Sequence, residues 1–271
     1  MSEKQQCVNA SGGVLTGSEL RLAYDSNEPV IEDVTIQIQS CSTVGLIGPN
    51  GCGKSTLLRG LSQKLSPKAG RVVLDGSAID EYGTKELARK LGFLSQQRPS
   101  PDGITVEELV EYGRYPHQGF FEGITEEDRA AIEQAIESAR LGPIRDRTLK
   151  DLSGGQQQLA WIGMCLAQNS EILLVDEPLT HLDLRNQLLV LDVLTSLESR
   201  TVVTALHDLQ SAARFADTIV ALKDGTIYDQ GDPESVLTES LLADVFGVNA
   251  TVARIDGKLQ LQLESPIEQP N

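Results

Sequence analysis

Hydrophobic and polar residues alternate in two stretches near the start of the chain, 19–24 (ELRLAY) and 34–40 (VTIQIQS), as they do in half-buried β-strands. Six further strands are predicted by apolar runs, at 43–48, 71–76, 91–96, 171–178, 201–208 and 218–225. Residues 54–65 have the apolar spacing of a helix, and helical segments separate the last three strands. Strands that alternate with helices predict a mostly parallel sheet with helices on both faces.

The pattern becomes helical from about Pro99 to Leu166. Two helix starts within this block have the sequence of a capping box, Thr105 with Glu108 and Thr125 with the acidic Asp128. The second of these helices carries one apolar stripe, formed by Ile132, Ile136 and Ala139. A helical block therefore interrupts an α/β core.

These patterns predict the following organisation. Residues 1–18, polar and rich in Gly and Ser, form a flexible lead-in, and residues 19–250 form the main domain. Its core comprises 19–98 and 167–250, and its helical part covers about 99–166. The remaining segment, 251–271, suggests a small hairpin and tail, with Asp256 and Gly257 as the turn.

Composition narrows the functional class. The chain has 271 residues, 40% of them hydrophobic, and a formal net charge of -16. Such an acidic chain is a poor partner for nucleic acid or anionic lipid, which bind clustered Lys and Arg. Cysteine spacing fits neither disulfides nor metal ligation, so reduced thiols are predicted at Cys7, Cys41, Cys52 and Cys165. Without a signal peptide or an apolar run long enough to span a membrane, the protein is expected to be soluble and intracellular.

The segment Gly48–Ser55 (GPNGCGKS) matches the phosphate-loop pattern G-x-x-x-x-G-K-[ST] between a predicted strand and a predicted helix. Glycines let the backbone curl so that its amides point at the phosphates of a nucleotide. Lys54 adds a positive charge there, and Ser55 offers a hydroxyl to Mg²⁺. A plain glycine turn is the alternative interpretation, and the strand–loop–helix context disfavours it.

Two carboxylates follow the apolar strand ILLV, at Asp176 and Glu177. In phosphate-loop enzymes an acidic residue at such a strand end holds the metal. The next carboxylate can orient or polarise the attacking water. An Asp-Glu pair in isolation is usually only a polar strand end, but the phosphate loop favours the catalytic interpretation.

The segment LSGGQ (152–156) resembles the signature of ABC-type ATPases, and the other motifs follow in the order and spacing of that family. Gln96 stands at the glutamine loop, Asp183 at the D-loop and His207 at the switch histidine. Tyr24 stands where the family has an aromatic residue that stacks on adenine. The resemblance covers essentially residues 19–250.

The resemblance implies a phosphate-loop NTPase of RecA-like type, an α/β fold with a mixed sheet, an antiparallel β part and an inserted helical subdomain. It implies ATP and Mg²⁺ as cofactors, and catalysis by Lys54, Gln96, Glu177 and His207. Magnesium ligands would be Ser55, Gln96 and Asp176. Nucleotide contacts are implied for Tyr24, Gly48, Pro49, Asn50, Gly51, Cys52, Gly53, Lys54, Ser55, Thr56, Ser153, Gly154, Gly155, Gln156 and Asp183.

In this family two copies pack head to tail, and each signature faces the nucleotide held by the other copy. Ser153 would then bond the γ-phosphate, and the start of its helix would favour the negative charge. The family usually has Arg where this chain has Gln157 and Leu159, which indicates a change in helix packing or in contacts between subunits.

Several of these residues have a simpler alternative. Tyr24 could be buried in the sheet, and Asp183 could be an ordinary loop residue. His181 is interpreted as a surface residue near the dimer seam. His117 lies where Pro116 could end a helix and Tyr115 could pack beneath it.

The resemblance is narrower in three segments, residues 47–59, 103–118 and 152–168 (LSGGQQQLAWIGMCLAQ). These segments are similar to the ATPase subunits of bacterial importers for ferric siderophores and related iron chelates. That class implies a separate membrane permease, an extracytoplasmic substrate-binding protein and a location on the cytoplasmic face of the membrane. The alternatives are an importer for haem or cobalamin, efflux, and a soluble ATPase of iron–sulfur cluster assembly. DNA-repair ATPases are disfavoured. They carry a long coiled coil between the phosphate loop and the signature, and the segment between Lys54 and Ser153 is too short to contain one.

Overall fold

The computed structural model describes residues 15–24, 28–96, 98, 102–119 and 123–267. Most of the predicted lead-in, Cys7 and Pro99 lie outside the described residues. Contacts between backbones divide the chain into two compact units. We call the first the loop unit, because it contains the phosphate loop; it comprises 1–79 and 203–271. The second, 80–202, is the helical unit.

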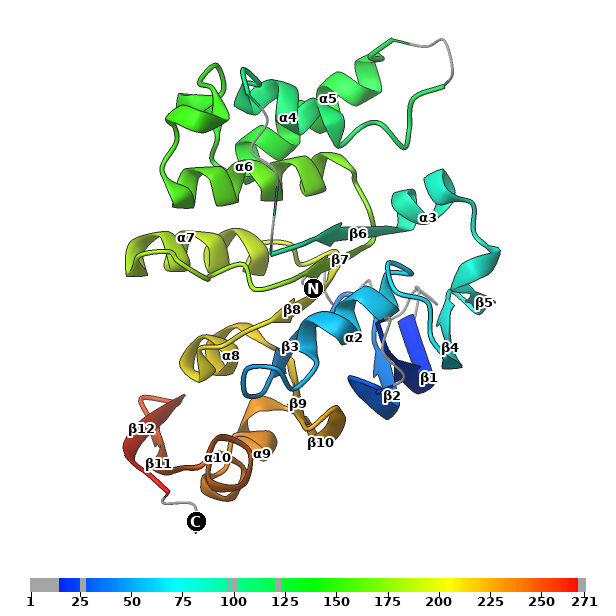
Figure 1. Cartoon of the computed structure of the whole chain (residues 1–271). Helices are drawn as coiled ribbons and strands as arrows, with labels where there is room; N and C mark the ends of the chain where they lie inside the picture. Colours follow the sequence, from blue (N-terminus) through cyan, green and yellow to red (C-terminus); the bar gives the residue numbers. More distant parts are fainter. Residues whose placement is uncertain (1–14, 25–27, 97, 99–101, 120–122, 268–271) are drawn as a thin grey trace. The chain divides into compact units, whose positions relative to one another are not determined.

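The loop unit contains an antiparallel sheet of four strands in the order β2-β1-β4-β5 (Figure 1). These strands are β1 (Leu15–Leu22), β2 (Ile31–Ile38), β4 (Ala69–Leu74) and β5 (Ser77–Ala78). On β2 the buried residues Ile31, Val34, Ile36 and Ile38 face the core and polar residues occupy most other positions, as the alternation predicts. Strand β1 begins earlier than predicted, at Leu15.

The phosphate-loop segment follows a strand of a second sheet. In the loop unit this sheet has the strand order β10-β9-β3-β8, with β3 (Thr43–Ile47) parallel to β9 (Thr218–Lys223). Strand β8 (Thr201–Ala205) confirms a predicted apolar run. Strand β10 (Thr226–Gly231) pairs antiparallel with β9 and was not predicted, because its residues are mostly exposed and lack a clear apolar pattern. Among its described residues, this unit has the helices α2 (Lys54–Leu61), α8 (Leu209–Phe215), α9 (Pro233–Val236) and α10 (Glu239–Phe246).

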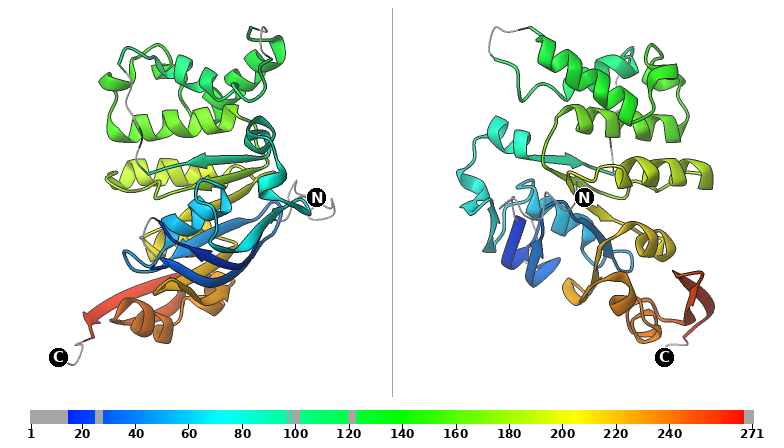
Figure 2. Two further views of the ribbon diagram at one scale, coloured as in Figure 1. Left: turned by 45° about the vertical axis from the view of Figure 1, so that its right-hand side comes forward. Right: turned by 180° about the vertical axis from the view of Figure 1, so that it is seen from behind.

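A hairpin near the end of the described chain confirms the prediction of a small hairpin with an Asp-Gly turn. Strand β11 (Val248–Ile255) pairs antiparallel with β12 (Lys258–Pro266), and Asp256 and Gly257 both have positive φ. Figure 2 shows this hairpin next to α10. It also contacts α8, where the Gln210 amide donates to the carbonyl of Leu259 at 2.8 Å and accepts from the amide of Leu261 at 3.2 Å.

The helical unit pairs two parallel strands, β6 (Leu91–Leu94) and β7 (Ile172–Val175). Helix α3 (Thr84–Lys90) precedes β6, and α4 (Val106–Tyr112), α5 (Glu126–Ser138) and α6 (Gly154–Ala167) pack on one another. Helix α7 (Leu184–Thr195) contacts α6. Single 3₁₀ turns lie at Ile79–Glu81, Gly142–Ile144 and Leu149–Asp151.

Both predicted capping boxes in the helical unit are confirmed. The Thr105 hydroxyl accepts from the Glu108 amide, and the Thr125 hydroxyl accepts from the Asp128 amide. The predicted apolar stripe of α5 is also buried, at Ile132, Ile136 and Ala139. The helix starts and the core face of this block therefore follow from local sequence.

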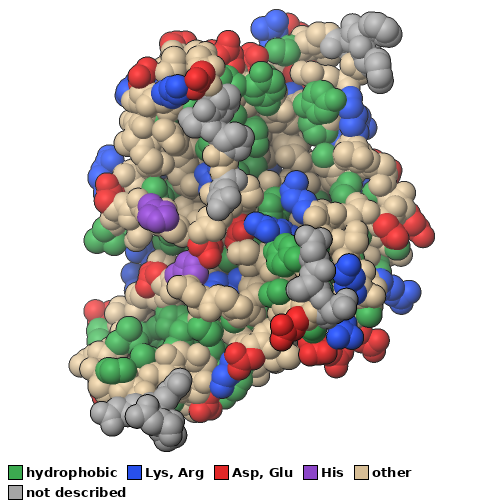
Figure 3. All heavy atoms as spheres, viewed as in Figure 1, with side chains coloured by type: hydrophobic (Ala, Val, Ile, Leu, Met, Phe, Trp, Pro, Cys, Tyr) green, Lys and Arg blue, Asp and Glu red, His purple; other side chains and the backbone are tan. Residues whose placement is uncertain are grey.

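Acidic, basic and hydrophobic side chains are interspersed on the face drawn in Figure 3. Among the described helices, none combines the length and the apolar character that a membrane span requires.

Candidate nucleotide-binding and catalytic site

Three glycines of the phosphate loop adopt backbone conformations that other residues rarely accept. Gly48, Gly51 and Gly53 have φ values of 147°, 81° and 107°. A Cβ on Gly48 would lie 2.3 Å from the carbonyl oxygen of Leu222, and one on Gly53 would lie 2.5 Å from Ile31. Gly53 is the N-cap of α2 and supplies no side-chain cap to the first amides of the helix. The loop thus has the backbone of an anion site at a helix start.

The side chain of Lys54 folds back into this loop. It is 4% exposed, and its ammonium donates to the carbonyls of Gly48 at 2.7 Å and Pro49 at 3.0 Å. Burial raises the pKa of the neighbouring Cys52 thiol above its usual value, and the nearby charge of Lys54 offsets only part of this increase. The loop therefore encloses a positive charge whose hydrogen bonds go to the loop's own carbonyls.

Tyr24 lies against the phosphate-loop helix instead of being buried in the sheet, so the alternative interpretation is wrong. Its side chain is 40% exposed, and its hydroxyl lies 3.3 Å from the hydroxyl of Thr56. Arg59 donates to the same hydroxyl at 3.0 Å and lies 5.9 Å from the ring centroid. Sequence reasoning missed Arg59, which holds an exposed aromatic ring beside the loop; its place one helical turn after the loop is the only sequence signal.

In the helical unit, Asp176 and Glu177 follow β7 as predicted. Asp176 is fully buried, and its amide donates to the carbonyl of Leu94 at 2.8 Å, which ties the end of β7 to β6. Glu177 has a positive φ of 50°, an unfavourable conformation for a residue with a side chain. Its carboxylate accepts hydrogen bonds from the Gln96 amide at 2.6 Å and from the Thr180 hydroxyl at 3.2 Å. The predicted glutamine and the predicted catalytic carboxylate are thus in direct contact.

Arg98, two residues after Gln96, links this segment to α6. It donates to the carbonyl of Ser95 at 2.7 Å and to the Gln158 side chain at 2.6 Å. Burial lowers the pKa of Arg98 to about 10, so the guanidinium stays charged at neutral pH. A polar cavity of about 180 Å³ is lined by Gln96, Arg98, Gln158 and Glu177, and also by Gly154 and Trp161. Sequence reasoning did not identify Arg98 or Gln158.

The signature segment forms the start of α6. Ser153 is its N-cap, and a capping box pairs it with Gln156: the Ser153 hydroxyl accepts from the Gln156 amide at 3.4 Å, and the Gln156 side chain accepts from the Ser153 amide at 3.1 Å. Gln157 donates to the carbonyls of Leu149 at 3.0 Å and Leu152 at 3.3 Å, so it ties this helix end to the preceding turn. Leu159 is buried. Within the chain, both residues therefore contribute to the packing of α6.

The remaining predicted residues lie at element ends. Asp183 is the N-cap of α7, and its carboxylate accepts from the amide and the side chain of Asn186. Gly155 lies against the same Asn186, since an added Cβ would lie 2.3 Å from it. His207 follows β8 and is exposed, as is His181. Among the described residues, no cluster of three or more His, Cys, Asp or Glu side chains could hold a metal ion.

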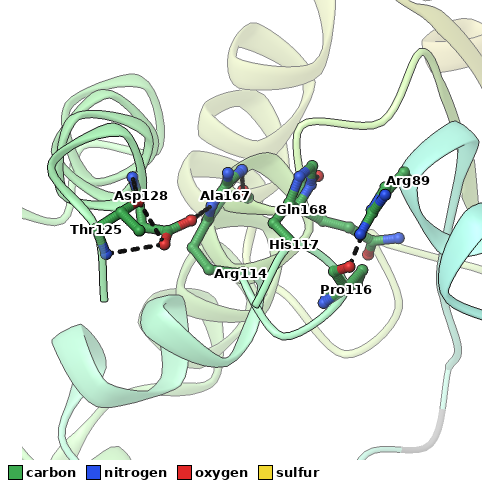
Figure 4. Close-up of polar contacts among 8 residues, drawn as sticks. All are labelled: Arg89, Arg114, Pro116, His117, Thr125, Asp128, Ala167 and Gln168. Atoms are coloured by element: carbon green, nitrogen blue, oxygen red, sulfur yellow. Dashed lines mark hydrogen bonds and ion pairs between the residues drawn. The ribbon is translucent and has the colours of Figure 1, made fainter. Parts of the chain in front are cut away.

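Residues 113–118 (GRYPHQ), which follow α4, are held against the end of α6 (Figure 4). Arg114, 2% exposed, donates to the Asp128 carboxylate and to the carbonyl of Ala167, both at 2.8 Å. The ring Nε2 of His117 lies 2.8 Å from the carbonyl of Gln168, and it must be the donor because a carbonyl oxygen only accepts. Tyr115 is 64% exposed, so the alternative in which it packs beneath the preceding helix is wrong.

We expect replacement of Arg114 by methionine to lower the free energy of unfolding by about 3–5 kcal/mol, because it leaves a buried carboxylate without its partner. Burial alone would raise the pKa of Asp128, but hydrogen bonds from Thr125 and Arg114 lower it to about 2, so this carboxylate is ionised at neutral pH. Urea denaturation measures the loss.

The control is Arg129→Ala, which removes the exposed ion pair with Glu126 on α5. That change should cost less than about 1 kcal/mol. Equal losses in the two variants would show that the Arg114–Asp128 pair contributes no more than a surface pair.

Comparison with known proteins agrees with this geometry. The family model described as ABC transporter matches residues 31–180. The Bacillus subtilis protein named "Probable siderophore transport system ATP-binding protein YusV" is 44% identical over 87% of this chain and 86% of its own length. The Ferric enterobactin transport ATP-binding protein FepC of Escherichia coli is 42% identical, over 88% of this chain and 89% of its own length.

Solved structures show the same fold. An ABC transporter in an inward-facing conformation is 25% identical with a TM-score of 0.79, over 95% of this chain and 99% of that chain. The dimeric ABC transporter cassette MJ0796 is 29% identical with a TM-score of 0.71, over 81% and 98% of the two chains. The fold is therefore that of a phosphate-loop NTPase, and the chain belongs to the ABC transporter family.

Proposed function

We propose that this chain is the ATP-hydrolysing subunit that powers import of ferric siderophores or related iron chelates through a separate membrane permease. The observation that carries the proposal is its similarity, at 42–44% identity over most of the chain, to ATP-binding proteins named for siderophore, iron-hydroxamate and ferric enterobactin transport. The ATPase would act on the cytoplasmic face of the membrane and would not itself contact the chelate.

The phosphate loop and Tyr24 would bind ATP. Backbone amides of Asn50 to Thr56 would donate to the phosphates, Lys54 would exchange its bonds to loop carbonyls for bonds to phosphate oxygens, and Tyr24 would stack on adenine. The contacts of Tyr24 with Thr56 and Arg59 support this role, because they hold its ring beside the loop without burying it.

The oxygen donors of Ser55, Gln96 and Asp176 fit Mg²⁺, which prefers hydroxyl, carbonyl and carboxylate ligands. Gln96 donates its amide group to Glu177, so its carbonyl oxygen is the atom suited to a cation. When bound with ATP, the ion would neutralise charge on the β- and γ-phosphates.

Glu177 would accept a proton from the attacking water, and His207 would contact the γ-phosphate. The Glu177 carboxylate accepts hydrogen bonds from Gln96 and Thr180. These bonds would either rearrange and release the carboxylate to the water, or hold it in the direction of the water. The Gln96 contact supports a role of the glutamine loop in positioning this base.

Two copies would enclose each ATP. The start of α6, with Ser153, Gly154, Gly155 and Gln156, would face the γ-phosphate bound by the other copy. The capping box supports this role, because it fixes the helix start and leaves the amides of Gly154 and Gly155 for an anion. Hydrolysis would remove the bridge and let the copies separate.

The alternatives are import of haem or cobalamin and a role in iron–sulfur cluster assembly. A cobalamin import ATP-binding protein of Halobacterium salinarum is also related, at 35% identity. The higher identity to the siderophore proteins favours iron chelates.

Capture from membranes tests the transport role. We expect tagged Glu177→Gln protein, with ATP, to co-purify a polytopic permease from detergent-solubilised membranes of its host, because the hydrolysis-deficient dimer should stay assembled on it. Mass spectrometry identifies the captured proteins.

Lys54→Ala serves as the control, since it should not form the ATP-bound dimer. Recovery of a soluble assembly scaffold without any membrane protein would contradict the transport role.

A further inference from the structure

Arg98 connects the segment of Gln96 to α6, and no step proposed above uses it. Its guanidinium donates from Nε to the carbonyl of Ser95 at 2.7 Å and from Nη1 to the side-chain oxygen of Gln158 at 2.6 Å. Ser95 directly precedes Gln96, and Gln158 belongs to α6. One side chain therefore fastens the backbone next to Gln96 to a neighbouring helix.

The orientation of Gln158 depends on this contact. Gln158 is 8% exposed, and its Oε1 accepts from Arg98, whereas its Nε2 is buried and has no hydrogen-bond partner among the described residues. The opposite orientation of the amide would place two donors against each other, because a guanidinium only donates. A buried donor without an acceptor is unfavourable, so the contact with Arg98 is maintained at the expense of that nitrogen.

Arg98 and Gln158 face the same cavity as the proposed general base. The polar cavity of about 180 Å³ is lined by Gln96, Arg98, Gln158 and Glu177, and among the described residues its lining includes no Lys and no second Arg. Burial lowers the pKa of Arg98 to about 10, and the nearby charge of Asp176 opposes this decrease. The guanidinium therefore stays charged at neutral pH, as a strong hydrogen-bond donor.

The position of the Glu177 carboxylate depends in turn on Gln96. The Gln96 amide donates to it at 2.6 Å, a shorter contact than the 3.2 Å bond from Thr180. The backbone of Glu177 has a φ of 50°, so the residue follows β7 in a conformation that side chains disfavour. Because a misplacement of about 1 Å can lower a rate by about 10²-fold, a shift of Gln96 would be felt in catalysis.

We propose that Arg98 is a positioning residue for ATP hydrolysis, which acts on the Glu177 carboxylate through Gln96. It would hold the backbone at Ser95 against Gln158 and so fix the side chain that bonds to the base. Arg98 itself would contact neither ATP nor the attacking water. This inference rests on the proposed role of Glu177 as the base.

Steady-state turnover of the full chain tests the role. Arg98→Met keeps the length of the side chain and removes both donated hydrogen bonds, so kcat should fall about 10–100-fold. The KM for ATP should stay within about twofold, because Arg98 makes no contact with bound nucleotide. Arg98→Lys, which can donate to one of the two oxygens, should recover part of kcat. The control Arg140→Met, which alters an exposed arginine paired with Asp192, should turn over as wild type does.

Gln158→Leu removes the same bond from the other partner. It should lower kcat as Arg98→Met does, and the double variant should be no slower than the slower single variant, because both remove one shared interaction. Circular dichroism shows that each variant is folded. Wild-type kcat in folded Gln158→Leu, or additive losses in the double variant, would overturn the proposal.

Combination with Glu177→Gln separates positioning of the base from a general structural effect. Arg98→Met should cause no further decrease in the single-turnover rate of Glu177→Gln, since no base remains to be positioned. A further decrease of the size seen in the wild-type background would show that Arg98 acts elsewhere. Wild-type kcat in Arg98→Met would overturn this inference and leave the role of Glu177 intact, whereas wild-type turnover in Glu177→Gln would overturn both.

Discussion

Replacing Glu177 by glutamine is expected to lower kcat for ATP hydrolysis by roughly 10²–10⁴-fold, the usual contribution of a general base. Glutamine keeps the shape of the side chain and can still bond to Gln96 and Thr180, but it cannot take a proton from water. ATP affinity should stay within about threefold of wild type, and the ATP-bound dimer should accumulate. Phosphate release and sedimentation velocity measure these two effects.

The matched control is Glu171→Gln, which alters an exposed glutamate just before the other end of β7. Its turnover should equal that of wild type. Turnover of Glu177→Gln within a few-fold of this control would exclude Glu177 as the base.

Replacing Lys54 by alanine is expected to weaken ATP binding by about 10²–10⁴-fold, because each hydrogen bond from a charged group contributes about 1.5–3 kcal/mol and the ammonium would make two with the phosphates. The variant would also leave the carbonyls of Gly48 and Pro49 without their present donor. Fluorescence titration with a labelled ATP analogue measures the affinity.

Lys68→Ala, an exposed lysine of the same unit, should bind ATP normally. Thermal unfolding of both variants shows whether the loop unit remains folded. ATP binding of wild-type strength in folded Lys54→Ala would contradict the role of this lysine.

The phosphate loop illustrates what sequence could predict. The glycines at positions 48, 51 and 53 follow from a local requirement for positive φ, so the motif and its place between β3 and α2 could be read without a structure. Capping residues such as Thr105, Thr125 and Ser153 are local in the same way, since each bonds a residue three positions later.

Contacts between distant segments could not be predicted in the same manner. Arg114 meets Asp128 on another helix, and Arg98 meets Gln158 far along the chain. Neither pair has a sequence pattern, because tertiary packing brings its members together. The resemblance indicated that Gln96 and Glu177 belong to the catalytic machinery, but their hydrogen bond is a feature of the folded helical unit.

Some errors had a simple physical cause. The alternative in which Tyr115 packs beneath the preceding helix was wrong because Arg114 and His117, and not Tyr115, bond to the carbonyls at the end of α6. Strand β10 escaped detection because it is mostly exposed and is stabilised by pairing with β9, not by an apolar pattern of its own.

The most direct test of the central claim is uptake of radiolabelled iron into proteoliposomes that contain the captured permease and its substrate-binding protein. With wild-type chain and ATP on the side of the ATPase, we expect ferric siderophore to accumulate in the compartment on that side, and with Glu177→Gln we expect none. ATP hydrolysis by the wild-type complex without transport of any ferric chelate, or with transport of cobalamin instead, would contradict the assignment.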